Sequence, residues 1–119
     1  MPALQKAFKV QKKAARVGFD WEKVEDVIAK MEEELREVRQ ALAKGDYREV
    51  KEELGDLLFS AANLSRFLKV NPEEALERAT KKFIERFKRV EAELAAQGKE
   101  IGHASLEEMD RLWEAVKRQ

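Results

Sequence analysis

Cysteine is absent from the 119-residue sequence, and histidine occurs once, as His103. The lack of cysteine excludes disulfides, a thiolate nucleophile and zinc or iron–sulfur sites with cysteine ligands. A single histidine cannot form a metal-binding cluster, and we expect His103 to lie in a loop without a catalytic task. Any metal must therefore be held by oxygen atoms, which favours magnesium, manganese or calcium.

The sequence also lacks an excess of one charge and any long hydrophobic run. Its 24 Lys and Arg residues balance 24 Asp and Glu residues, whereas non-specific nucleic-acid binding usually needs a basic excess. No apolar run approaches the roughly 18 residues of a membrane-spanning helix, and the N-terminus has no apolar stretch typical of a signal peptide. We therefore expect a cytoplasmic protein that binds neither nucleic acid nor membrane.

Glycine and proline are scarce, with five and two residues, and most of them stand where a helix should begin or end. No segment alternates polar and apolar residues with a period of two, so no sheet is expected. The apolar share of 44% suffices for one core. The sequence predicts an all-α antiparallel bundle of about four to five helices, forming a single domain over residues 1–119.

Capping signals divide the chain into these helices. The first helix covers residues 3–16 and ends near Gly18, and Asp20 is the expected N-cap of the second, which ends at Gly45. The later helices have N-cap signals of their own: Asp46 with Glu49, Asn71 before Pro72, and Ser105 with Glu108. Behind the caps, apolar residues recur at helical spacing and should form the core; in the second and third helices they include Val27, Ile28, Leu35, Leu42, Val50, Leu54, Leu58 and Ala61.

Four acidic residues are expected to meet at one level of the hairpin formed by the second and third helices. Glu34 and Glu37 are three residues apart, as are Glu53 and Asp56, so each pair lies on one side of its helix. Residues equally distant from Gly45 should face each other, which places all four acids at the same height. Their mutual repulsion would be relieved by a hard divalent cation. The alternative is that they are ordinary solvated acids.

Several other residues allow two interpretations. Gly55 inside a helix costs about 1 kcal/mol relative to alanine, so it either admits a close neighbour at the site or allows tight helix packing. Asn63 either contacts a substrate or bonds a neighbouring helix. A basic stripe of Lys82, Arg86 and Arg89 suits an anionic substrate such as a polyphosphate, or is a solvated face paired with nearby glutamates.

The spacing Glu33-Glu34-x-x-Glu37 followed by Glu52-Glu53-x-x-Asp56 resembles the MazG family of nucleoside triphosphate pyrophosphohydrolases. The similarity covers nearly the whole chain and is greatest to the C-terminal catalytic domain of two-domain members. It implies an all-α fold, assembly into a homodimer or higher homo-oligomer, and Mg²⁺-dependent hydrolysis of a nucleoside triphosphate to a monophosphate and pyrophosphate. Mn²⁺ is the alternative cation.

The resemblance also implies roles for individual residues. Glu34, Glu37, Glu53 and Asp56 would be the metal ligands, and Lys30, Lys82, Arg86 and Trp113 would contact the nucleotide, with Asn63 as a further candidate. Glu33, Glu37 and Glu52 are candidates to position the attacking water, and the sequence does not choose among them. For Trp113 the alternative is a place in the core or at an interface with a partner. For Lys30 it is a salt bridge to Glu34.

Three other functions are consistent with parts of this pattern. A related all-α pyrophosphohydrolase could act on phosphoribosyl-ATP or dUTP, and the motif does not separate these substrates. A non-catalytic helical interaction module would leave the acids solvated. A carboxylate di-iron bundle usually needs Glu-x-x-His ligands, which the single His103 disfavours.

Overall fold

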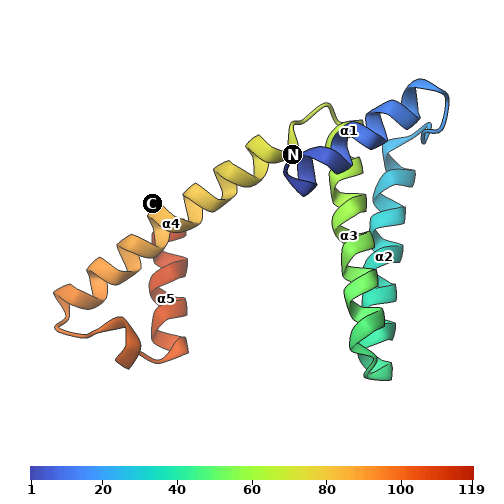
Figure 1. The fold of residues 1–119 in the computed structure, drawn as a ribbon. Helices are drawn as coiled ribbons and strands as arrows, with labels where there is room; N and C mark the ends of the chain where they lie inside the picture. Colours follow the sequence, from blue (N-terminus) through green and yellow to red (C-terminus); the bar gives the residue numbers. More distant parts are fainter. The chain divides into compact units, whose positions relative to one another are not determined.

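The structure, a computed structural model that describes all of residues 1–119, is entirely helical. The elements are α1 (Ala3–Arg16), α2 (Val24–Lys44), α3 (Tyr47–Phe67), α4 (Pro72–Ala96), the short 3₁₀ turn η1 (Ile101–His103) and α5 (Leu106–Lys117) (Figure 1). The absence of strands and the presence of five α-helices confirm the predicted fold class. None of the helices combines the length and the apolar character needed to cross a membrane.

Most helix ends are fixed by the capping residues predicted from the sequence. Gly45 closes α2 in the left-handed conformation, with φ at 71°, which glycine adopts without a steric cost. Asp46 then caps α3, because its carboxylate accepts hydrogen bonds from the backbone N–H groups of Arg48 and Glu49. Asn71 and Ser105 cap α4 and α5 in the same way. Local chemistry therefore sets the tight turn that brings α2 beside α3.

The predicted N-cap role of Asp20 is wrong. The helix α2 begins only at Val24, after Lys23 in an extended conformation and without a side-chain cap. Asp20 instead forms a two-point ion pair with Arg66 of α3, at 2.5 and 3.1 Å. A bidentate arginine–carboxylate pair is stronger than one capping hydrogen bond, so the tertiary contact wins over the local one.

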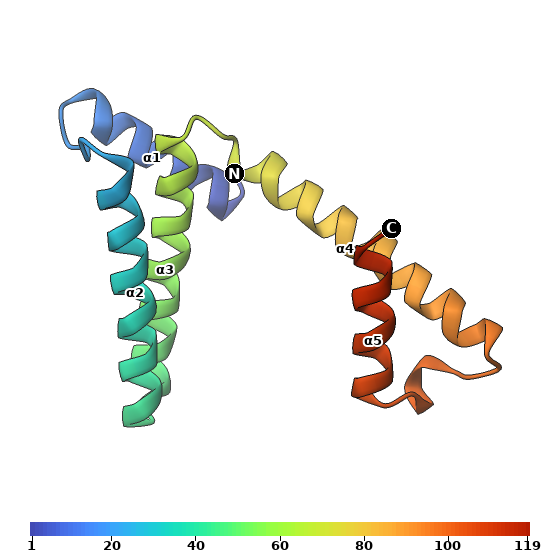
Figure 2. The ribbon, with the colours of Figure 1, turned by 180° about the vertical axis from the view of Figure 1, so that it is seen from behind.

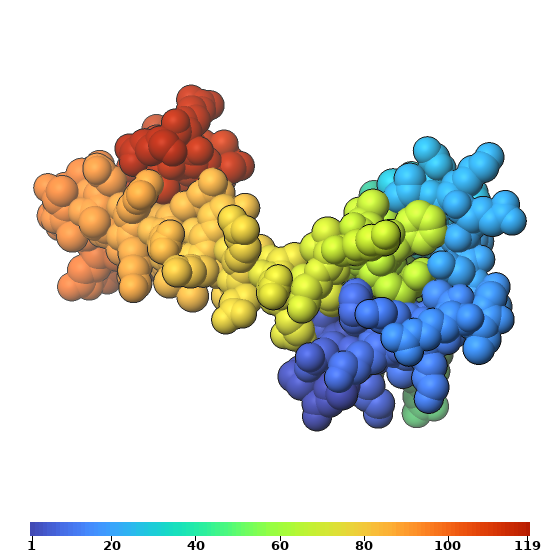
Figure 3. Space-filling view, turned by 90° about the horizontal axis from the view of Figure 1, so that it is seen from above, coloured from blue at the N-terminus to red at the C-terminus, as the bar shows by residue number.

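The chain folds into two compact units, residues 1–75 and 76–119. In the first unit α2 and α3 form an antiparallel hairpin, and α1 lies across its open end against α3 (Figures 1 and 2). The space-filling view shows atoms of α1 directly against the C-terminal part of α3 (Figure 3). Val27, Ala41 and Ala62 are the buried apolar residues of this unit. The single-domain organisation stays a prediction.

The second unit is built from α4 and α5. Its core consists of Val90, Leu94 and Val116, against which Trp113 and neighbouring partly buried side chains pack. His103 lies in the connection between the two helices and is exposed, and its Nδ1 is 3.8 Å from Oε2 of Glu100.

The expectation that the whole apolar stripes of α2 and α3 form a core is wrong. Ile28, Leu35 and Leu42 recur every seven residues on α2 and are all exposed, as are Leu54 and Leu58 on α3. The exposed fraction reaches 57% for Leu42 and 60% for Leu58. Two helices pack along only one face of each, and α1 covers only the open end of the hairpin, so the rest of each stripe has no partner within the first unit.

Gly55 has no close neighbour within the first unit. A Cβ atom added at this position would meet nothing within 4 Å. Tight packing within the first unit therefore does not explain the glycine.

Candidate functional site

Three of the four predicted metal ligands meet on the α2–α3 hairpin. Glu34 and Glu37 come from α2 and Glu53 from α3, and one carboxylate oxygen of each lies within 4.8 Å of the others. Because the hairpin turns at Gly45, residues at matching distances from the turn lie at one height. This mirrored register is the reason that acids far apart in sequence converge.

The cluster is partly withdrawn from water, although it carries several acids. Glu34 is buried, with 6% of its surface exposed, and its Oε1 forms an ion pair with Lys30 Nζ at 3.0 Å. The second oxygen, Oε2, is buried without a hydrogen-bond partner, and so is Oε2 of Glu53. Unpartnered buried carboxylate oxygens are costly, and here two of them occur within one cluster.

Glu53 is the acid whose ionisation is most altered. A hydrogen bond with Glu37, together with burial and the negative charges of Glu37, Asp56 and Glu34, raises the pKa of Glu53 to about 7. The metal-free cluster therefore holds a proton at mildly acidic pH, in place of one negative charge.

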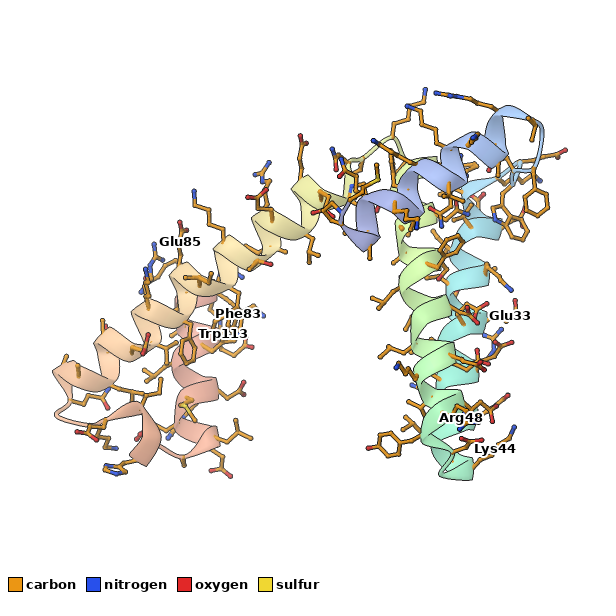
Figure 4. The ribbon with its side chains drawn as sticks, viewed as in Figure 1. Glu33, Lys44, Arg48, Phe83, Glu85 and Trp113 are labelled. Atoms are coloured by element: carbon orange, nitrogen blue, oxygen red, sulfur yellow. The ribbon has the colours of Figure 1, made fainter.

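The remaining predicted acids lie around this cluster rather than within it. Asp56 is exposed and stands outside the group of three converging carboxylates, although its charge contributes to the raised pKa of Glu53. Glu33 and Glu52 are exposed, and Glu33 (labelled in Figure 4) pairs with Lys30 at 3.3 Å. Lys30 thus bridges Glu33 and Glu34, and these contacts raise its pKa.

Lys82, Arg86 and Trp113 belong to the second unit. Lys82 is exposed and Arg86 half-buried, and neither forms an ion pair, so the pairing with Glu77 or Glu85 considered from the sequence is not present. Trp113 is partly buried and stands beside Phe83, with ring centroids 5.1 Å apart (Figure 4). Trp113 therefore packs against the core, and its role in nucleotide binding stays a prediction.

A pocket of about 370 Å³ lies between α1, the loop after it and α3. Asn63 lines this pocket and accepts a hydrogen bond from Arg66 Nε at 2.8 Å. Gln11 lines it as well, is 7% exposed, and donates a hydrogen bond from Nε2 to the backbone carbonyl of Phe59 at 2.7 Å. The other lining residues are Val10, Ala14, Phe19, Asp20, Trp21, Phe59 and Arg66.

Sequence reasoning selected Asn63 but missed the rest of this pocket. One signal was available, since Gln11 interrupts the apolar face of α1 formed by Leu4, Phe8 and Ala15 at helical spacing. A polar residue within an apolar stripe indicates a buried polar contact. The pairing of Asp20 with Arg66 has no comparable signal, because the two residues are 46 positions apart.

The fold and the acid cluster place this chain among the all-α proteins in which acidic side chains from two adjacent helices converge. The chain belongs to the MazG family: the MazG nucleotide pyrophosphohydrolase domain matches residues 22–91, which span α2, α3 and most of α4. The converging acids all lie within the matched segment, whereas α1 and α5 lie outside it.

Curated relatives extend the similarity over nearly the whole chain. It is 49% identical over 117 residues to the nucleoside triphosphate pyrophosphohydrolase/pyrophosphatase MazG of Thermotoga maritima, covering 98% of this chain and 45% of that protein. It is 46% identical over 123 residues to the nucleoside triphosphate pyrophosphohydrolase of Escherichia coli K12, covering 100% of this chain and 46% of that protein. The chain thus spans slightly less than half the length of these relatives.

Proposed function

We propose that this chain hydrolyses nucleoside triphosphates to nucleoside monophosphates and pyrophosphate with the aid of a divalent cation, Mg²⁺ in the first place and Mn²⁺ as the alternative. The observation that carries the proposal is the convergence of Glu34, Glu37 and Glu53 within 4.8 Å. Membership of the MazG family and the activity after which the two relatives are named support the same reaction.

The residues of the cluster fit a hard cation. Opposite oxygens around one Mg²⁺ are about 4 Å apart, so a small closure of the three carboxylates would suffice. The buried Oε2 atoms of Glu34 and Glu53 lack partners, and a cation would provide one for each. Asp56 lies three residues after Glu53 and would complete the set by a change of rotamer. When bound, the cation would neutralise negative charge on the triphosphate.

The chain's own acids would prepare the attacking water. Glu33, Glu37 and Glu52 stand in or beside the cluster and remain the candidates to orient it and accept its proton. The water oxygen would bond to the α-phosphorus while the bond to the bridging oxygen breaks, and pyrophosphate would leave with that oxygen. The chain has no cysteine, and nothing near the acids resembles an activated covalent nucleophile.

Basic residues would hold the substrate. Lys30 already contacts two acids of the site, and the half-buried Arg86 and exposed Lys82 have guanidinium and ammonium groups free of ion pairs for a polyphosphate. Trp113 and Asn63 complete the proposed contacts to the nucleotide.

We also propose that the functional form is a homodimer or a higher homo-oligomer. The exposed apolar side chains at Ile28, Leu35, Leu42, Leu54 and Leu58 support this, because monomeric proteins rarely expose such continuous stripes. A second copy would cover them and would bring further groups to the acid cluster.

Product analysis tests the reaction. A panel of canonical, deoxy and damaged triphosphates, with phosphoribosyl-ATP included, is incubated with Mg²⁺ and the products are identified. We expect monophosphate and pyrophosphate from at least one nucleoside triphosphate. Preference for phosphoribosyl-ATP or dUTP would instead assign the chain to the related activities considered from the sequence, and no turnover at all would favour a non-catalytic module.

Two variants test whether the acids carry this reaction. Glu53→Gln and Asp56→Asn each remove a negative charge from the proposed cation site, and each should lower turnover by a factor of about 10² or more. The fold should survive, because relief of carboxylate repulsion offsets the lost contact. Near-normal turnover in both variants would contradict the assignment.

A further inference from the structure

The outer face of α1 concentrates positive charge in a chain that is neutral as a whole. The helix contains four lysines, one arginine and no acidic residue. Because the charges of the whole chain balance, the rest of it carries a net charge of −5. The total charge therefore does not describe this face.

The basic side chains of α1 form one continuous ridge. Lys6, Lys9, Lys13 and Arg16 follow one another at intervals of three, four and three residues, which is the spacing of a single helical stripe, and Lys12 stands beside it. The ridge extends about 15 Å along the helix axis. All five side chains are exposed and none forms an ion pair. Figure 4 shows nitrogen-tipped side chains of α1 that extend away from the hairpin. Their charge is thus uncompensated within the first unit.

The opposite face of α1 is already occupied. It packs against α3, where Gln11 is buried and bonded to the backbone carbonyl of Phe59. A basic helix that binds a membrane surface buries its apolar face at the boundary of the acyl chains, and α1 has no apolar face free to do so. The basic ridge must therefore act through charge alone.

The composition of the ridge favours a phosphate backbone over a protein partner. Gln5 is the one uncharged residue of α1 on the same side of the helix, so the ridge offers no aromatic or aliphatic anchor. Stable protein interfaces depend on such anchors, and single-stranded nucleic acids are held largely by stacking of their bases on aromatic side chains. A duplex needs neither, because its phosphates contact lysine and arginine directly.

We propose that the basic ridge of α1 binds the phosphate backbone of a nucleic-acid duplex without sequence preference. The proposal does not rest on nucleotide hydrolysis, because the acid cluster is formed by α2 and α3. It departs from the expectation, drawn from the balanced total charge, that the chain binds no nucleic acid. Charges more than about 8 Å away are largely screened at physiological salt, so the local excess of cations decides the contact.

The salt dependence of binding tests the proposal on the unaltered full chain. A fluorescently labelled DNA duplex of about two helical turns and mixed sequence is titrated with the protein, and binding is followed by fluorescence anisotropy. Four phosphate contacts should make the affinity fall by roughly 10²-fold between about 50 and 200 mM salt. Absence of binding at the lower salt concentration, or an affinity that salt does not change, would overturn the proposal.

A double variant tests whether α1 makes the contact. Lys9→Gln/Lys13→Gln should weaken duplex binding about tenfold or more and should make the salt dependence shallower. The matched control, Lys81→Gln/Lys88→Gln, removes the same charge from exposed positions of α4 and should bind like the unaltered chain. An equal loss in both variants would contradict the role of α1. Circular dichroism checks the helices of both variants, and the salt titration of the unaltered chain decides if the α1 variant does not fold.

Three further measurements separate the other possible partners of the ridge. A single DNA strand of the same length and vesicles containing phosphatidylserine are titrated under the same conditions, and the duplex should bind more tightly than either. Tighter binding of the single strand or of the vesicles would overturn the assignment to a duplex. Light scattering without nucleic acid should give the same mass for the unaltered chain and for Lys9→Gln/Lys13→Gln. A lower mass for the variant would mean that a second copy covers the ridge, which also overturns the proposal.

Discussion

Two unfavourable effects act on the side chains of the acid cluster: the carboxylates repel one another, and some of their oxygens are buried. Glu53 retains a proton up to about pH 7 because Glu37 bonds to it and three acids surround it. Only one carboxylate oxygen of Glu34 has a partner, the ammonium group of Lys30, and the other oxygen is buried without one. An arrangement that is strained without a cation and relieved by one is what a metal site requires.

Alanine substitution should affect kcat/KM very differently at two neighbouring basic residues, Arg86 and Lys88. Arg86 is half-buried and without an ion pair, whereas Lys88 is exposed on another side of α4. If Arg86 grips the polyphosphate, Arg86→Ala should lower kcat/KM by the equivalent of about 2–4 kcal/mol, and Lys88→Ala should be nearly silent. Steady-state kinetics check this.

Arg86→Lys refines the same test. It should remain impaired, because an ammonium group cannot reproduce a planar fork of two donors. Indistinguishable kinetics for Arg86→Ala and Lys88→Ala at unchanged melting temperature would remove Arg86 from the substrate site. A sharp fall in melting temperature for Arg86→Ala would instead make the residue structural.

Among the elements, the α2–α3 hairpin is the part that the sequence predicts best. The caps at Gly45 and Asp46 are local signals, and a turn fixed between two regular helices determines which residues face each other. That is why the acids could be brought together from spacing alone. The contacts of α1 and of the loop after it could not be predicted, since Gln11 reaches Phe59 and Asp20 reaches Arg66 across more than forty residues.

Gly55 gives a prediction at the scale of the helix. Its added Cβ would meet open space, so Gly55→Ala should raise the free energy of unfolding by about 1 kcal/mol through helix propensity. The melting temperature should then rise by about 4 °C. A fall in melting temperature would contradict this and would show that a group from outside the first unit approaches α3 closely at Gly55.

At the scale of the whole molecule, the contacts within the first unit do not explain the exposed apolar stripes of α2 and α3. A sequence pattern shows that Leu42 and Leu58 belong to apolar stripes, but it does not show whether the same chain or a second one covers them. The expectation of a core that includes them was wrong for that reason. Likewise, the placement of the basic stripe of α4 toward the acids stays a prediction, because periodicity fixes a helix face and not its partner.

Leu58→Arg tests the proposed assembly. A buried arginine without a partner is costly, so this variant should dissociate the oligomer to monomers and lower activity while the helical circular dichroism signal is kept. Leu106→Arg is the matched control, because Leu106 is 79% exposed and lies on α5, outside the stripe. Multi-angle light scattering at micromolar concentration separates the outcomes. A wild-type chain that is monomeric and fully active would refute the proposal.

The most direct test of the cation site is a calorimetric titration of Mg²⁺ at pH 6 and pH 8, in buffers of different ionisation enthalpy. Because the pKa of Glu53 is raised to about 7, the metal-free site is mostly protonated at pH 6, and binding must expel that proton. We therefore predict proton release at pH 6 but little at pH 8, tighter binding at pH 8, and no proton release from Glu53→Gln. Absence of Mg²⁺ binding, or binding at pH 6 whose heat is the same in every buffer, would contradict the account.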